Sequence, residues 1–156
     1  MIIIRHATDA DAPTLVSLNA DVQAIHAAAL PWRFKPPGAW TAADAQALLV
    51  RPNYFALIAE VDRAPAGYVV AEVIRHPETG RHHAHEMIYV HEISVREALR
   101  RRGVGRALLD AVTGRGKELG IDRVALDTWS FNEGALKFFR SYGLTPYNVR
   151  LWSKGD

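Results

Sequence analysis

The stretch that decides the fold is Arg100-Arg101-Arg102-Gly103-Val104-Gly105. It lies between a strand-like segment that ends at Val95 and an amphipathic helix. The turn and the helix N-terminus together form an anion site, because unpaired amides and the helix dipole both favour negative charge. Glycines let phosphate oxygens approach the main chain, and arginines add charge-assisted hydrogen bonds. The stretch therefore predicts a site for a diphosphate.

Two common phosphate motifs do not match this stretch. No Gly-Lys-Ser or Gly-Lys-Thr follows it, which excludes a Walker A loop. The strand before it is the fourth along the chain rather than the first of a βαβ unit, which excludes a dinucleotide fingerprint. A simpler interpretation, with glycines as turn residues and arginines as a solvated helix start, stays open at this point.

The segments before this stretch alternate between strand-like and helical patterns. Residues 2–4 read as a strand, and residues 8–11 have the spacing of a capping box before a helix that runs to residue 29. Prolines and a glycine in residues 30–38 break that helix, and a short second helix runs from Thr41 to about Arg51. Strands follow at residues 54–61, 67–74 and 86–95, with short connections that predict an antiparallel meander.

After the glycine stretch the same alternation continues. A helix ends at Gly120, residues 122–129 form a strand, and a helix capped by Asn132 ends at Gly143. Residues 147–152 predict a last strand. The order β-α-α-β-β-β-α-β-α-β defines an α/β fold, with a mixed central sheet of six to seven strands and helices on both faces.

The composition is that of an ordinary folded chain. Of 156 residues, 49% are hydrophobic and 23% charged, and the length predicts a single domain over residues 1–156. No apolar run reaches the roughly 18 residues of a membrane helix, and the first residues do not resemble a signal peptide, so we expect a cytoplasmic protein with no membrane partner. Cysteine is absent, which excludes disulfides, thiolate metal ligands and a cysteine acyl-enzyme.

Charged and histidine-rich segments bear on nucleic-acid and metal binding. The net charge is only +2, yet several arginines crowd residues 96–106, which fits a local anion site better than a nucleic-acid surface. His82, His83, His85 and Glu86 lack helical ligand spacing and a cysteine partner. We therefore predict an exposed turn there and no metal.

Two signatures resemble those of GNAT acetyltransferases. Arg100, Gly103 and Gly105 follow the family's acetyl-CoA pyrophosphate pattern, Arg/Gln-x-x-Gly-x-Gly/Ala, and residues 132–144 are similar to its second signature, with an Asn, an Ala three positions on, an aromatic pair and a Gly. The element order also matches over essentially the whole chain. The resemblance implies the GNAT fold and direct transfer of an acetyl group from acetyl-CoA to a primary amine.

The resemblance also implies which residues bind acetyl-CoA. The amides of residues 101–106 would hold the pyrophosphate, while the main chain of residues 93–95 and Asn132 would contact the pantetheine arm. An amide at Ile93 or Ser94 would stabilise the oxyanion. The predicted binding residues are Ile93, Ser94, Val95, Arg100, Arg101, Arg102, Gly103, Val104, Gly105, Arg106 and Asn132.

The base that deprotonates the amine is predicted on residues 86–95. Strand alternation puts His91 on one face and Glu92 on the other, so only one of them should reach the amine. The ordinary pKa of His91 suits a base, whereas Glu92 would need burial to raise its own pKa. Structural interpretations, a half-buried His91 and a surface Glu92, stay open.

The general acid is the position where this chain departs from the family. The family usually has a tyrosine second in the aromatic pair, where this chain has Phe139. Tyr142 lies one turn onward and is the candidate replacement, with core packing as the alternative. Residues 30–40 are expected to shape the acceptor pocket or to pack as a surface loop.

Rival functions follow from the same features. The missing tyrosine keeps open a catalytically silent acyl-CoA-binding regulatory module, and the arginines keep open a nucleic-acid binder. The acceptor is not identified. Members of the family often pair through late strands, so the apolar residues 147–152 also suggest a homodimer.

Overall fold

A computed structural model describes residues 1–155, and its centre is a five-stranded sheet with the order β1-β2-β3-β4-β5. Neighbouring strands pair antiparallel from β1 to β4, whereas β4 and β5 pair in parallel, which confirms a mixed sheet. The strands are β1 (Ile2–His6), β2 (Tyr54–Val61), β3 (Ala64–His76), β4 (His85–Val95) and β5 (Val124–Leu126).

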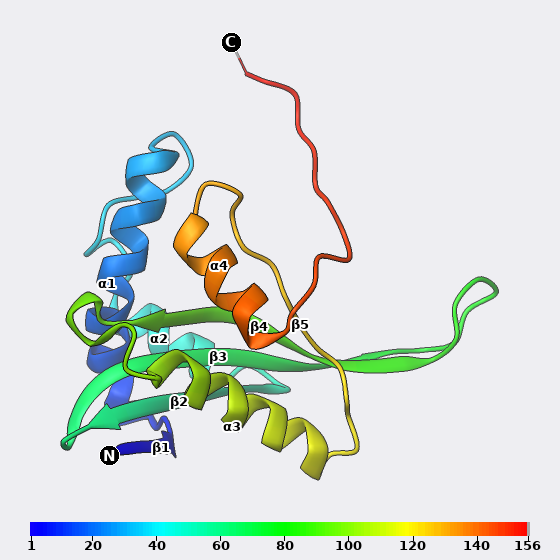
Figure 1. Cartoon of the computed structure of the whole chain (residues 1–156), viewed down its shortest axis with the longest axis horizontal. Helices are drawn as coiled ribbons and strands as arrows, with labels where there is room; N and C mark the ends of the chain where they lie inside the picture. Colours follow the sequence, from blue (N-terminus) through cyan, green and yellow to red (C-terminus); the bar gives the residue numbers. More distant parts are fainter. Residues whose placement is uncertain (156) are drawn as a thin grey trace.

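Four α-helices within residues 1–155 cover the two faces of the sheet (Figure 1). They are α1 (Ala12–Ala29), α2 (Ala42–Leu49), α3 (Val104–Glu118) and α4 (Glu133–Tyr142). Apolar residues of α3 and α4 pack against one face in a first core cluster, and those of α1 and α2 pack against the other face in a second. Helices on both faces are therefore confirmed. In the described part of the chain, no helix is long and apolar enough to cross a membrane.

The predicted number of six to seven strands is wrong. Residues 147–152 lie in extended chain without a strand partner within the described part of the molecule, and they run away from the sheet after α4 (Figure 1). Tyr147, Val149 and Leu151 are exposed, and Trp152 packs on Trp32 and Trp129. An apolar alternating pattern forms a strand only where a neighbouring strand supplies hydrogen bonds. The homodimer stays a prediction.

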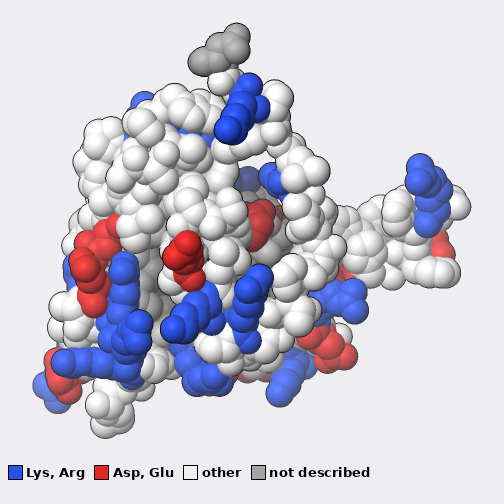
Figure 2. Space-filling view, turned by 45° about the horizontal axis from the view of Figure 1, so that its top comes forward, with Lys and Arg blue, Asp and Glu red and all other residues white. Residues whose placement is uncertain are grey.

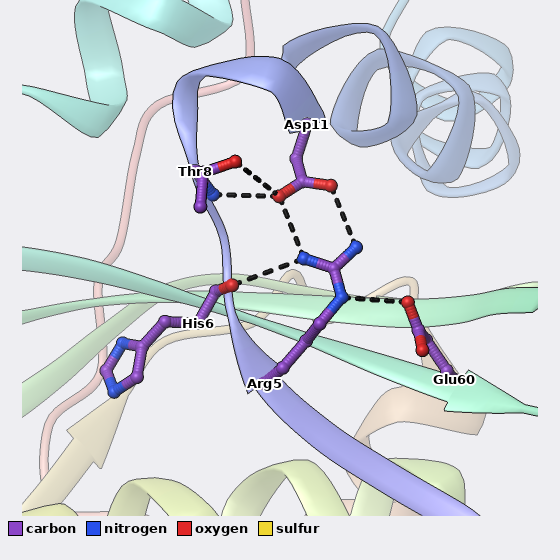
Figure 3. A network of polar contacts seen from close by, with 5 residues as sticks. All are labelled: Arg5, His6, Thr8, Asp11 and Glu60. Carbon is purple, nitrogen blue, oxygen red and sulfur yellow. Dashed lines mark hydrogen bonds and ion pairs between the residues drawn. The ribbon is translucent and has the colours of Figure 1, made fainter. Parts of the chain in front are cut away.

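A polar network fixes the start of α1 to the sheet (Figure 3). The guanidinium of Arg5 on β1 binds both carboxylate oxygens of Asp11 at 2.8 and 2.9 Å and donates to Glu60 of β2 at 2.8 Å. Asp11 also accepts from the amide of Thr8 at 2.8 Å, as the capping-box spacing predicted. Hydrogen bonds from Arg5 lower the pKa of Asp11 to about 2. The network thus orients α1, which forms one wall of the site described next.

Candidate functional site

A β-bulge in β4 is the local feature that shapes the site. Val70 of β3 pairs with Glu92, whereas its neighbour Ala71 pairs with Val90, so His91 has no partner on β3. The pairing of β4 with β5 ends at Val90 and Leu126. Beyond that point no strand of residues 1–155 lies beside residues 91–95 on the β5 side. We call this opening between residues 91–95 and the chain after β5 the fork.

Main-chain groups of β4 face the fork. The amide of Arg96 donates to Ala66 of β3 at 2.9 Å. Because an antiparallel strand turns alternate residues toward the same neighbour, the amide of Ser94 also faces β3, while those of Ile93 and Val95 face the other side. The carbonyl of Val95 there accepts from Arg100 Nε at 3.1 Å. Ile93 therefore offers a main-chain edge on which an extended ligand can pair.

The anion loop, residues 100–105, joins this edge to α3. Gly103 is the N-cap of α3, and both Gly103 and Arg101 have left-handed backbones, with φ of 82° and 64°. A positive φ is strained for arginine and easy for glycine. The loop thus turns the chain sharply onto the helix N-terminus, where unpaired amides favour an anion. The strand, turn and helix predicted for the stretch are confirmed.

Glycine is required at position 105 for a packing reason that the sequence did not reveal. A Cβ at this position would lie 2.9 Å from the Phe138 ring of α4. The absence of a side chain therefore lets α4 approach the start of α3. This packing links the two segments that carry the family signatures.

The arginines near the loop divide into anchored and outward-facing side chains. Arg96 donates to Pro65 and Ser17, and Arg106 stacks over the Tyr142 ring at 5.1 Å. Arg101 and Arg102 are exposed. Figure 2 shows Lys and Arg side chains gathered in the lower part of one face, with acidic side chains among them. A cleft of about 340 Å³ lies between Arg100 and α1.

The bulge places His91 and Glu92 on the same face of the sheet. His91 contacts Glu72 and Tyr54, and Tyr54 packs against the second core cluster with α1 and α2. Glu92 contacts Tyr68, which belongs to that same cluster. The prediction that alternation separates the two side chains is wrong, since the extra residue of a bulge interrupts the period of two.

Glu92 lines an open pocket. The pocket has a volume of about 540 Å³ and is lined by Trp40, Asp44, Ala47, Leu48, Arg51 and Glu92. Burial raises the pKa of Glu92, while the hydrogen bond from Tyr68 and the nearby His91 oppose that rise. A partly buried carboxyl with a raised pKa in a pocket of this size is suited to accept a proton from a small molecule.

His91 is held by its neighbours. Its Nε2 lies 2.8 Å from Glu72 Oε1, and its ring stacks on Tyr54 at 4.9 Å. Its side chain is 32% exposed. A carboxylate can only accept, so Nε2 donates to Glu72 and Nδ1 is the ring nitrogen that can accept a proton. Glu92, and not His91, is among the residues that line the pocket, which favours a supporting role for His91.

Helix α4 carries Phe139 and Tyr142 on the face of the sheet opposite His91 and Glu92. Asn132 caps α4 by accepting from the amide of Ala135 at 3.2 Å, as predicted. Phe139 is buried in the first core cluster. The hydroxyl of Tyr142 donates to Asp110 of α3 at 2.7 Å. The structure therefore does not bring Tyr142 together with His91 and Glu92.

Several polar residues at the site were missed by sequence reasoning. Tyr68 and Asn19 lie beneath Glu92, Glu72 holds His91, and Asp127 accepts from Tyr89 at the start of the fork. All of them come from segments whose patterns predicted only helix or strand. Trp40, from the loop of residues 30–40, lines the pocket, and the role of the loop in binding the acceptor stays a prediction.

Comparison with known proteins agrees with this architecture. The family model described as the Acetyltransferase (GNAT) family matches residues 19–144. An uncharacterised N-acetyltransferase of Lactobacillus delbrueckii subsp. lactis is 26% identical over 110 residues, which cover 69% of this chain and 61% of that protein. Another, of Bacillus subtilis, is 28% identical over 69 residues, or 44% of each protein. The chain thus matches less than two thirds of the length of either relative.

Solved structures share the fold at low sequence identity. A four-substitution variant of the BH1408 protein of Bacillus halodurans superposes with a TM-score of 0.92 at 24% identity, over 97% of this chain and 99% of that one. The aminoglycoside N-acetyltransferase AAC(6')-Iy, solved with CoA, gives 0.75 at 21% identity, over 99% and 95%.

The mixed sheet with helices on both faces defines an α/β protein. The family match over most of the length makes the assignment specific: the chain belongs to the GNAT family of N-acetyltransferases, which are acyltransferases.

Proposed function

We propose that the protein transfers an acetyl group from acetyl-CoA directly to a primary amine. The observation that carries the proposal is the fork, where the free main-chain edge at Ile93 leads into the anion loop. That arrangement fits a ligand with an extended amide-bearing arm and a diphosphate. Membership of the GNAT family supports the same cosubstrate.

The cosubstrate would lie along residues 93–106. The diphosphate would be bound by the main-chain amides of the anion loop and of the first turn of α3, residues 101–106. The exposed guanidinium groups of Arg101 and Arg102 would add charge-assisted hydrogen bonds. The main-chain groups of Ile93 and Val95 would pair with the pantetheine arm, and the side-chain nitrogen of Asn132, whose oxygen caps α4, would contact the same arm. Ser94, whose hydroxyl donates to Leu18 at 3.1 Å, would fix the strand rather than touch the ligand.

Glu92 is the base in this proposal. The amine enters as an ammonium through the pocket, and Glu92 accepts one proton before nitrogen attacks the thioester carbon. The amide of Ile93 stabilises the oxyanion of the tetrahedral intermediate. The carbon–sulfur bond then breaks, and the nitrogen gives a second proton to the departing thiolate while the third stays in the amide product. The carboxyl is suited to the first step because its raised pKa makes it a stronger base than an exposed carboxylate.

The test is thermal unfolding with and without acetyl-CoA, with ATP and NAD as controls for general phosphate binding. A ligand at 100 times its dissociation constant stabilises the folded state by about 2.7 kcal/mol. We expect a rise of Tm with acetyl-CoA alone, followed by release of CoA in a screen of primary amines. A rise without turnover of any amine would favour the silent acyl-CoA-binding module. Equal rises with all three ligands would contradict the assignment of the loop.

A further inference from the structure

A buried chain of polar side chains lies beneath Glu92. Tyr68 of β3 is fully buried, and its hydroxyl donates to Glu92 Oε1 at 3.4 Å. Asn19 of α1 is 8% exposed, and its Nδ2 donates to the Tyr68 hydroxyl oxygen at 3.0 Å. Three elements, α1, β3 and β4, thus each supply one member. None of the three members takes part in the contacts proposed for acetyl-CoA.

The hydrogen-bonding capacity of each group determines which group donates and which accepts in this series of three side chains. A phenol has one proton and an oxygen that accepts, and Asn19 already donates to that oxygen. The Tyr68 proton is therefore left to donate, and Glu92 is the acceptor within reach. A carboxylate can only accept, so this arrangement matches the ionised form of Glu92.

The apolar surroundings of Tyr68 mean that burying its hydroxyl costs free energy unless the hydroxyl is hydrogen-bonded. Tyr68 lies among apolar residues of the second core cluster, where a phenylalanine would pack without needing any partner. A buried hydroxyl must be hydrogen-bonded to avoid a desolvation cost. Its two partners come from different elements, which constrains their relative positions. The two hydrogen bonds thus link the carboxyl of Glu92 through Tyr68 of β3 to Asn19 of α1.

We propose that Asn19 and Tyr68 are positioning residues that hold the Glu92 carboxyl ionised and aimed into the acceptor pocket. Tyr68 occupies Oε1 from below, which leaves Oε2 for the incoming ammonium. Asn19 acts through Tyr68 by fixing the direction of its proton. The proposal rests on the proposed function, because it assigns Glu92 as the base of that reaction.

Other charged and titratable groups near Glu92 are few within residues 1–155. His91 adjoins it on β4, and Asp44 and Arg51 of the α2 region line the same pocket. Asp44 is engaged with the amide and hydroxyl of Thr41, and Arg51 stacks on Tyr54 at 4.4 Å. Tyr68 is therefore the hydrogen-bond donor to the Glu92 carboxylate among the described residues.

The variant Tyr68→Phe tests the proposal by removing the donor and keeping the ring. Loss of that hydrogen bond lets burial raise the pKa of Glu92 further, so the acidic limb of the kcat/KM profile should move to higher pH. We expect kcat at neutral pH to fall about tenfold, with KM for acetyl-CoA unchanged. Asn19→Leu should shift the limb in the same direction by less.

The control is Ile58→Ala in the same core cluster. Ile58 is fully buried on β2 opposite Tyr68 and does not contact Glu92 through any hydrogen bond. This variant should lower Tm without moving the acidic limb. A limb that moves as far in Ile58→Ala, or that stays in place in both Tyr68→Phe and Asn19→Leu, would overturn the positioning role.

An activity-independent measurement separates this proposal from the proposed function. The carboxyl signal of Glu92 can be titrated by NMR in protein with ¹³C-labelled glutamate and assigned by its loss in Glu92→Gln. We expect the titration midpoint to rise in Tyr68→Phe. If no amine is acetylated but the midpoint rises, the proposed function fails and the positioning stands. An unchanged midpoint contradicts the positioning even in an active enzyme.

Discussion

The anion loop and the bulge of β4 lie only a few residues apart, yet they depend on the sequence in different ways. The loop, residues 100–105, needs a strand, a left-handed Gly103 and a helix start, all of which are local. The bulge arises from how β4 pairs with Val70 and Ala71, which come from another strand. The anion loop can therefore be predicted from local sequence, whereas the placement of His91 and Glu92 depends on how β4 pairs with β3.

The largest effect is expected in the loop, from Gly103→Asp. A carboxylate there would face the diphosphate, and like charges at close range cost several kcal/mol, or roughly 1,000-fold in affinity. We expect acetyl-CoA binding to be lost while the protein stays folded, as followed by calorimetry and by Tm without ligand.

Gly120→Asp is the matched control for Gly103→Asp. Gly120 also has a positive φ, 73°, and open space where a Cβ would lie, but it follows the opposite end of α3. Its variant suffers the same backbone strain without the nearby charge. Unchanged affinity in Gly103→Asp, or equal loss in both variants, would place the diphosphate elsewhere.

The next effect is expected at the bulge, from Glu92→Gln. This substitution keeps the shape and removes the base, and general-base catalysis is typically worth about 100-fold or more. We expect kcat to fall by about that factor with acetyl-CoA affinity retained, and the acidic limb of the pH profile to disappear. The limb belongs to Glu92 because only the ionised carboxylate can accept a proton, so activity is lost as pH falls through its raised pKa.

His91→Ala sharpens the choice between the two residues that the bulge brings together. Because Glu92, and not His91, is among the residues that line the acceptor pocket, we expect kcat of His91→Ala to change by no more than about threefold. The acidic limb should remain. A large loss with a vanished limb in His91→Ala, and a retained limb in Glu92→Gln, would reverse the assignment.

The same contrast describes what could be predicted from the sequence. The bounds of β2 were predicted as observed, and α3 and α4 were placed by their glycine and asparagine caps, because caps and hydrophobic periods are local signals. Of the eleven predicted cofactor-binding residues, nine lie on the anion loop, at the start of α3 or on the edge of β4 that faces the fork. Their binding roles stay predictions.

The failures share one physical cause. Residues 147–152 have the pattern of a strand but no neighbour to pair with in the described part of the chain, and His91 breaks the alternation because β3 offers it no partner. Tyr68 and Asn19 gave no signal, because a tyrosine in an apolar strand and an asparagine in a helix acquire meaning only when packed together. Strand pairing and side-chain packing between distant segments cannot be predicted from local sequence patterns.

The smallest effect on activity is expected from Tyr142→Phe. The Tyr142 hydroxyl donates to Asp110 on the face of the sheet opposite Glu92, and burial together with Asp110 raises its pKa. Its removal should lower the free energy of unfolding by about 1 kcal/mol and change kcat by no more than about twofold. Stability is measured by urea unfolding and kcat by CoA release.

Asp110→Ala provides the comparison for Tyr142→Phe. If the hydroxyl serves packing of α4 on α3, the two substitutions should be coupled in unfolding, since the double variant loses the same hydrogen bond only once. A fall in kcat of more than about tenfold in Tyr142→Phe alone, without such coupling, would instead make Tyr142 the acid for the thiolate. The late helix would then reach the chemistry through a rearrangement of α4, and the division between a local cofactor site and a tertiary chemical site would no longer hold.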